Sequence, residues 1–171
     1  EYNIRRSQCE RGAELLQQYD SEITSLRDVS LELLREHESK FDPEIFTRCE
    51  YVLEENLRVE ETCKCLEKDN YQGVGALMNA SHYGLSNKYE VSSMELDFLA
   101  YTAQGVEGVL GSRMMGAGFG GCTINLVQAE AVDELSAVLQ REYRREFERD
   151  ALIHVSKTEG GTSLIEDDSK A

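Results

Sequence analysis

Basic side chains are scarce in this sequence. Its 171 residues include 18 lysines and arginines against 33 aspartates and glutamates, which gives a formal net charge of −15. Such a negative field repels phosphodiester backbones and anionic lipid surfaces. We therefore expect no nucleic-acid partner.

Long apolar runs are missing as well. No uninterrupted stretch approaches the roughly 20 apolar residues that cross a bilayer, and the first residues lack the apolar core of a signal peptide. The five cysteines are odd in number and spread along the chain, unlike the dense, even disulfide framework of a small secreted protein. We therefore expect no membrane partner and a reducing, cytoplasmic location.

What is present suits a globular domain. Apolar residues make up 40% of the chain and charged residues 30%, which excludes disordered and fibrous classes. The chain opens without methionine in a motif-like stretch, which predicts a fragment of a longer protein. We expect one domain over residues 1–171, with a helical lead-in at 1–40, a core at 41–156 and a tail at 157–171.

Helical periodicity dominates the first two thirds of the chain. Apolar residues recurring at intervals of three and four, together with capping residues, predict helices over residues 3–19, 25–37, 43–67, 71–85 and 92–101. In the third of these, the predicted buried stripe extends to Leu57 and Val59. Glu50, Glu54 and Glu61 form an acidic face beside it, which we expect to be solvated.

The pattern changes after Gly105. Residues 109–115 and 122–127 read as two strands on either side of a glycine cluster, and residues 129–150 are helical again. The apolar run at 151–155 predicts a final buried strand. The expected fold class is α+β, with helices packed on a small antiparallel sheet.

The glycine cluster at 116–121 matches the string G-x-G-x-x-G, which alone is a weak signal for nucleotide binding. A dinucleotide site needs these glycines to lead from a strand into a helix, whereas here β-rich sequence follows them. Four glycines in six residues let backbone N–H groups approach a phosphate, and they suit a tight hairpin equally well. The pattern by itself leaves both interpretations open.

Other residues with chemical potential favour structural roles. His82 lies on a predicted helix, where histidine is more often a hydrogen-bonded packing residue than a base or a ligand. Cys63 and Cys65 have the wrong spacing for zinc and no second pair of ligands, so we expect no metal site. Cys122 is interpreted as an inert, half-buried strand residue. Two arginines at residues 5–6 can bind a phosphate or, more simply, helix-borne carboxylates.

Residues 111–123 closely resemble the third signature of galactokinases, which belong to the GHMP superfamily of sugar and small-metabolite kinases. Three further stretches agree with this family in the same order, within residues 1–10, 48–58 and 77–92. The resemblance covers nearly the whole chain. It implies the ferredoxin-like C-terminal domain of GHMP kinases, without the N-terminal ATP-binding domain.

The resemblance also implies roles for individual residues. Tyr2 occupies the position of the family tyrosine that hydrogen-bonds bound galactose. His82, Arg48 and Arg58 match positions that we assign to folding. The family's catalytic aspartate lies in the absent N-terminal half, so the resemblance implies no catalytic residue and no metal ligand in this chain. The loop implied to lie near the nucleotide phosphates comprises Gly116, Ala117, Gly118, Gly120 and Gly121.

By resemblance, the intact enzyme transfers the γ-phosphate of ATP, in the presence of Mg²⁺, to the C1 hydroxyl of galactose. Galactose and ATP are the implied partners, bound together with the N-terminal half, whereas the chain alone is expected to be inactive and to bind neither ATP nor Mg²⁺. Its exposed interdomain face is expected to favour self-association.

Two alternatives to a galactokinase stay open. Met115 and Ala117 differ from many galactokinases, and the Gly-Ala-Gly form also resembles kinases of N-acetylgalactosamine, so that sugar or another small metabolite is one alternative substrate. The other is a non-catalytic, galactokinase-like sensor that binds sugar and nucleotide without turnover.

Overall fold

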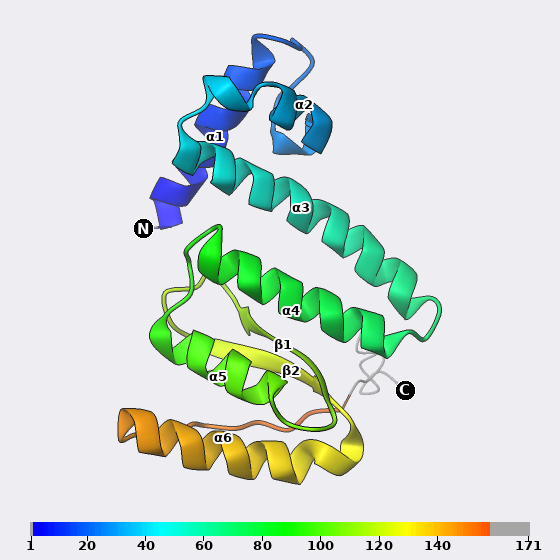
Figure 1. Ribbon diagram of the computed structural model, residues 1–171, viewed down its shortest axis with the longest axis vertical. Coiled ribbons are helices and arrows are strands. Elements are labelled where there is room, and N and C mark those ends of the chain that lie inside the picture. Colours follow the sequence, from blue (N-terminus) through cyan, green and yellow to red (C-terminus); the bar gives the residue numbers. More distant parts are fainter. Residues whose placement is uncertain (1, 158–171) are drawn as a thin grey trace, which may run out of the picture.

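The structure, a computed structural model, describes residues 2–157. Its helices are stacked along one axis, with α1 and α2 at one end and α6 at the other (Figure 1). No helix in this range is both long enough and apolar enough to cross a membrane. The elements are α1 (Tyr2–Gln17), η1 (Leu26–Asp28), α2 (Leu31–Glu36), η2 (Glu38–Lys40), α3 (Pro43–Leu66), α4 (Tyr71–Asn87), α5 (Met94–Gln104), β1 (Val109–Met115), β2 (Cys122–Val127), η3 (Ala129–Ala131) and α6 (Val132–Phe147).

Capping residues set the helix starts. The Asp42 side chain accepts hydrogen bonds from the N–H groups of Glu44 and Ile45, while Pro43 takes the first position of α3, where its missing N–H costs nothing. The helix predicted from residue 25 is wrong as a single element, because Ser25 caps only the short η1 and Ser30 caps α2 anew.

The start of α5 also differs from the prediction. The Ser93 hydroxyl accepts a hydrogen bond from the Leu96 N–H and so caps the helix. Ser92, the first residue of the predicted helix, instead donates a hydrogen bond from its hydroxyl to Asp97 Oδ1 at 2.5 Å.

The largest core cluster forms where α1, η1 and α2 surround the first half of α3. Its buried members are Ala13, Leu16, Ile23, Leu26, Val29, Leu34, Ile45, Cys49 and Leu53. The stripe predicted further along α3 is wrong, because Leu57 and Val59 are 52% and 60% exposed. The reason is that α3 extends past α1 and α2, so nothing from those helices covers its second half (Figure 1).

The acidic face of α3 is not merely solvated, contrary to expectation. The Nζ atom of Lys88 lies 3.2 Å from Glu50 and 2.8 Å from Glu54. Arg35 of α2 pairs with Glu50 at 3.0 Å from the other side. Two of the three predicted surface carboxylates therefore connect neighbouring helices, and only Glu61 is exposed.

The sheet consists of two antiparallel strands, β1 and β2, with Met115 opposite Cys122 at the turn. Helices α4 and α5 pack against β1, and the contact with α4 is so close that the backbones of Gly75 and Gly111 nearly touch. This arrangement confirms the predicted fold class of helices on a small antiparallel sheet. Cys122, predicted to be half-buried, is exposed because it is the first residue of β2, beside the glycine loop.

The predicted strand at 151–155 does not form. Leu152 and Val155 are 85% and 64% exposed, and only Ile153 packs on the cluster that includes Leu135 and Leu139 of α6. An apolar run is buried as a strand only where a neighbouring strand and covering side chains exist, whereas here the segment runs back beside α6 (Figure 1). Residues 158–171 of the predicted tail lie outside the described range.

His82 is a packing residue, as predicted. It is fully buried, its Nδ1 accepts a hydrogen bond from the Met114 N–H at 3.2 Å, and its Nε2 lies 3.3 Å from Asp97 Oδ1. Burial lowers the pKa of His82, and the negative charge of Asp97 raises it by a smaller amount. The side chain therefore joins α4, α5 and β1 in its neutral form.

We expect acid to weaken the fold through His82. Because the folded protein binds the proton less readily than the unfolded chain does, stability is highest above about pH 6.5 and falls as the pH drops below it. Thermal melts between pH 7.5 and pH 5 check this. The variant His82→Gln should be less stable at pH 7.5 and depend less on pH; an unchanged pH dependence in the variant would contradict the prediction.

Candidate functional site

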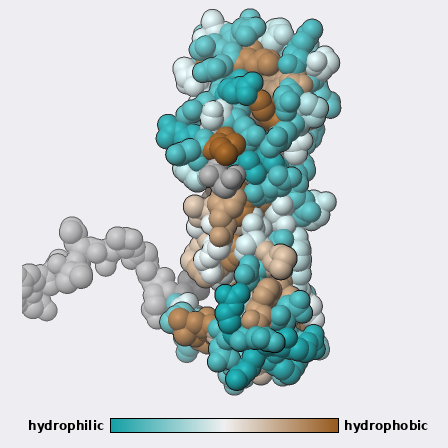
Figure 2. All heavy atoms as spheres, turned by 90° about the vertical axis from the view of Figure 1, so that its left-hand side faces the viewer, coloured by the Kyte–Doolittle hydropathy of each residue, from teal (hydrophilic) through white to brown (hydrophobic). Residues whose placement is uncertain are grey.

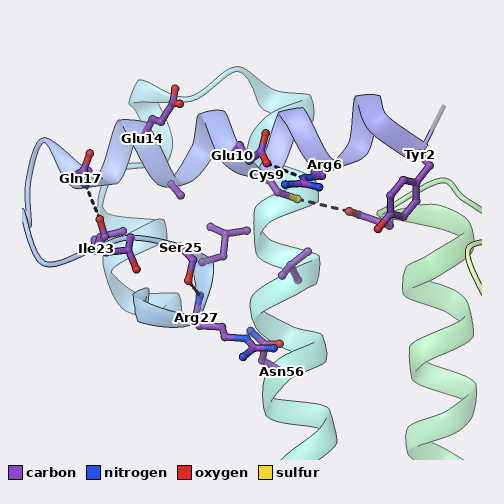
Figure 3. Close-up of a pocket in the computed structure, with 15 residues that line it drawn as sticks. Tyr2, Arg6, Cys9, Glu10, Glu14, Gln17, Ile23, Ser25, Arg27 and Asn56 are labelled. Carbon is purple, nitrogen blue, oxygen red and sulfur yellow. Dashed lines mark hydrogen bonds and ion pairs between the residues drawn. The ribbon is translucent and has the colours of Figure 1, made fainter.

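Tyr2, the predicted sugar-binding residue, lies in the first turn of α1 with 60% of its surface exposed. It stands at one end of a groove of about 680 Å³. Figure 3 shows α1 along one side of this groove, with Arg27 and Asn56 on the other. The lining residues are Tyr2, Arg6, Cys9, Glu10, Ala13, Glu14, Gln17, Ile23, Thr24, Ser25, Leu26, Arg27, Val52, Asn56 and Tyr89.

The two arginines after Tyr2 have different partners. Arg5 turns inward and is 8% exposed, and it donates from Nε to the Tyr89 carbonyl at 2.7 Å and from Nη2 to the Glu90 carbonyl at 3.2 Å. Arg6 stays at the surface and pairs with Glu10 at 2.8 Å. Arg5 thus fixes the start of α1 to the segment after α4, a role that the sequence did not reveal.

The glycine loop, residues 116–121, joins β1 to β2 as a tight hairpin. Its four glycines all have positive φ, from 87° at Gly118 to 135° at Gly120, and Phe119 has φ 60°. A Cβ atom at Gly116 or Gly120 would meet nothing within 4 Å, so the backbone there borders open space. The hairpin interpretation is confirmed, and the open backbone is compatible with the approach of a ligand.

The glycine loop is docked on the segment that holds α1. The Phe119 N–H donates to the Val91 carbonyl at 2.7 Å, and this carbonyl lies 2.0 Å from where a Cβ at Gly118 would be. Because Arg5 binds residues 89 and 90, the same short segment contacts both α1 and the glycine loop. The fold therefore brings Tyr2 and residues 116–121 to one region, although they are far apart in the sequence (Figure 1).

Exposed apolar side chains surround this region. Tyr2 and Ile4 on α1 are 60% and 50% exposed, and Met115 and Phe119 at the glycine loop are 49% and 43% exposed. Figure 2 views the side of the molecule that carries the N-terminus of α1, where the middle is mostly white to tan and brown patches lie above and below it among hydrophilic surface. Such a surface is typical of a face that packs against another domain.

The described residues offer no metal centre. Nowhere in residues 2–157 do three or more His, Cys, Asp or Glu side chains converge in a way that could hold a metal ion. The Mg²⁺ that the family resemblance implies therefore does not fit a site made by these residues. Within the glycine loop, the Phe119 N–H already donates to the Val91 carbonyl, so a phosphate would have to bind the N–H groups of neighbouring loop residues.

Cys9 is a groove residue that sequence reasoning passed over. Its Sγ lies 3.7 Å from the Tyr89 hydroxyl, and Figure 3 shows Cys9 on α1 beside the groove. A hydrogen bond from the buried Cys49 thiol, opposed by burial and helped by Tyr89 and Arg48, lowers the pKa of Cys9 to about 7. The same pairing raises the pKa of Cys49.

We expect Cys9 to be alkylated by iodoacetamide with a half-maximal rate near pH 7. The reason is that the thiolate is the reactive form and accepts hydrogen bonds from its neighbours. Mass-spectrometric peptide mapping over a pH series measures this, with the exposed Cys63 as an internal reference for the reagent. The variant Cys49→Ala should move the midpoint upward. A midpoint for Cys9 near that of a free thiol, about 8.5, would contradict the prediction.

Comparison with known proteins gives this geometry a family. Residues 62–145 match the family described as "GHMP kinases C terminal". Galactokinase from Roseiflexus sp. (strain RS-1) is 37% identical over 169 residues, which cover 99% of this chain and 43% of that protein. Galactokinase from Staphylococcus saprophyticus is 44% identical over 143 residues, which cover 83% of this chain and 37% of that protein.

A solved structure agrees with this family assignment. Lactococcus lactis galactokinase complexed with galactose matches with a TM-score of 0.80 and 36% identity over 87% of this chain and 38% of that one. The chain therefore spans well under half the length of these relatives. Each of them is a galactokinase, which favours that branch over the N-acetylgalactosamine kinase and sensor alternatives. The chain belongs to the GHMP kinase family, and the part of a galactokinase that it resembles is the C-terminal domain.

Proposed function

We propose that this chain forms one wall of the active site of a galactokinase, in which galactose and ATP bind between it and the rest of the enzyme. The observation that carries the proposal is that Tyr2 and the glycine loop lie on one region, joined through residues 89–91. The exposed apolar side chains around that region give the second domain a surface to cover.

In this proposal, Tyr2 contacts the sugar. A phenol offers a hydroxyl that donates and accepts hydrogen bonds on a flat apolar ring, which suits the polar edge and apolar face of a hexose. Residues 116–121 lie near the ATP phosphates, where the glycines allow close approach of the backbone. Because phosphoryl transfer depends mainly on positioning and charge stabilisation, the contribution of this chain is to orient the substrates.

The proposal requires the second domain. Mg²⁺ supplies charge neutralisation at the phosphates in kinases, and the described residues provide no cluster to hold it. A coupled ADP-release assay with galactose, on this chain alone and on the full-length protein that contains it, tests the requirement. Activity only in the full-length protein supports the proposal. Activity in this chain alone overturns it, and inactivity of both with galactose overturns the assignment of the substrate.

Tyr2→Phe in the full-length kinase is expected to raise the KM for galactose and to lower kcat/KM by about 2- to 10-fold, which corresponds to one neutral hydrogen bond of roughly 0.5–1.5 kcal/mol. The matched control is Tyr83→Phe, since Tyr83 is 57% exposed on α4 and lines no part of the groove. Steady-state kinetics with galactose varied provide the measurement. Equal kinetics for the Tyr2 variant and the parent would remove Tyr2 from the sugar site.

A further inference from the structure

The turn between α4 and α5, residues 88–91, is held by two arginines from other helices. Arg48 of α3 is 2% exposed, although it carries a charge. Its Nη1 donates to the Lys88 carbonyl, and its Nη2 lies 2.5 Å from the Glu90 carboxylate. Arg5 of α1 donates to the carbonyls of Tyr89 and Glu90. The two guanidinium groups thus bind three successive carbonyls and one carboxylate of the 88–91 turn.

The 88–91 turn has a conformation that needs such support. Glu90 has φ 51°, a left-handed backbone that side chains other than glycine, asparagine and aspartate adopt at a cost. A residue in this region persists where its surroundings determine its position. Both arginines bind the carbonyls or the side chain at and beside Glu90, so they stabilise the strained residue directly.

The next residue of this turn determines the position of the glycine loop. The Val91 carbonyl accepts the Phe119 N–H at 2.7 Å, and it leaves no room for a side chain at Gly118. A displacement of the 88–91 turn would therefore move residues 118 and 119 with it. The same displacement would release Arg5, which sits one helical turn after Tyr2.

We propose that Arg48 and Arg5 are positioning residues for the candidate active site: by holding the 88–91 turn, they set the place of the glycine loop relative to Tyr2. This inference rests on the proposed function for its effect on catalysis, but the mechanical link through Val91 does not depend on that function. It gives Arg48, which the family resemblance alone assigned to folding, a role directed at the loop.

Arginine suits this role better than lysine. A guanidinium group has five N–H donors in a fixed plane, so Arg48 reaches a carbonyl and two carboxylates at once, those of Glu90 and Glu44. An ammonium group keeps the charge but lacks the fork. Arg48→Lys therefore separates the loss of geometry from the loss of charge.

The link is tested first in the chain itself, by hydrogen exchange of the Phe119 amide followed by NMR. Exchange should be about tenfold faster in Arg48→Gln than in the parent, because the 88–91 turn loses stabilisation equal to about one hydrogen bond. The rate in Arg48→Lys should be intermediate. Amides in the middle of α6 should be unaffected. The matched control is Arg58→Gln, which removes an ion pair with Glu55 within the same helix α3 and away from the turn.

A milder variant keeps the test decisive if Arg48→Gln fails to fold. Glu90→Gln removes the carboxylate that both arginines approach, and the Glu90 side chain is 59% exposed, so the fold should tolerate it. Its Phe119 amide should also exchange faster than in the parent. Unchanged Phe119 exchange in Glu90→Gln and in every folded Arg48 variant overturns the inference, whatever the kinase activity.

Kinetics of the full-length kinase then show whether the link acts on catalysis. We expect Arg48→Lys to raise the KM for ATP and to lower kcat, with the parent's thermal stability largely retained. A purely structural role would lower the amount of folded enzyme but leave the KM and the kcat per folded molecule unchanged. Faster Phe119 exchange with unchanged kinetics would keep the mechanical link and refute the proposed function of the glycine loop. Unchanged exchange with altered kinetics would refute the link and leave that function standing.

Discussion

Replacing Gly75 with alanine is expected to lower the free energy of unfolding by about 3 kcal/mol, at the upper end of what overpacking costs. In an exposed helix this substitution would stabilise by about 1 kcal/mol, because alanine is the better helix former. Here a Cβ would lie 2.0 Å from the carbonyl oxygen of Leu110 and 2.3 Å from its carbonyl carbon. The obstacle is backbone of β1, which cannot rotate away as a side chain can.

The contact between α4 and β1 is central to the packing of the second half of the chain. Helix α4 lies directly on β1, with Gly75 facing the backbone of Leu110 and Gly111 facing the backbone of Gly75. To admit a methyl group, α4 and β1 would have to separate along the length that His82 and Asn79 also bridge. We therefore expect Gly75→Ala to weaken the packing of α4 along the whole sheet, and not only at the site of substitution.

Thermal and urea unfolding measure this effect. For a chain of this length, a loss of 3 kcal/mol corresponds to a fall in Tm of roughly 6–12 °C. The matched control is Gly105→Ala, because the Cβ there meets only ordinary contacts, the nearest at 3.5 Å. This control should stay within about 0.5 kcal/mol of the parent. If both variants were equally stable, the close packing of α4 on β1 would be disproved.

Gly118→Ala is expected to lower kcat/KM of the full-length kinase about 100-fold, the size of effect that a displacement of about 1 Å produces at a catalytic site. A Cβ at this residue would lie 2.0 Å from the Val91 carbonyl oxygen. The loop can escape this collision only by leaving the 88–91 turn and breaking the hydrogen bond from Phe119. Stability should change less than in Gly75→Ala, since the loop lies at the surface.

Gly116→Ala provides the control for backbone strain. Its φ of 89° is nearly that of Gly118, 87°, yet a Cβ there meets nothing within 4 Å. Both variants bear the cost of a left-handed alanine, of order 1 kcal/mol, and only Gly118→Ala also collides with the turn. Steady-state kinetics with ATP and galactose varied should therefore separate them. Equal losses in the two variants would mean that strain alone matters and that contact with Val91 does not.

Most positions of helices and strands were readable from the sequence because they depend on neighbours along the chain. Asp42 and Pro43 predict the start of α3, and the glycine cluster predicts a hairpin between two strands, as the structure confirms. The motif around that cluster was enough to indicate the family, which the comparisons confirm. Each of these inferences needs only local backbone preferences or a contiguous string of residues.

Burial and polar partners were decided by tertiary structure. Leu57 and Val59 fit the apolar stripe of α3 as well as the buried residues do, but α1 and α2 end before reaching them. The run at 151–155 has strand-like residues, yet it does not join the sheet of β1 and β2. Periodicity shows which side chains share a face; it does not show whether another element covers that face.

The candidate site divides in the same way. The sequence identified Tyr2 and residues 116–121 separately, through the resemblance of their motifs. Only the fold joins them, because Arg5 reaches carbonyls at 89 and 90 while Phe119 reaches the one at 91. Those carbonyls can accept hydrogen bonds from side chains because they lie after the end of α4 and before the start of α5. The types of residue in this segment do not predict that arrangement.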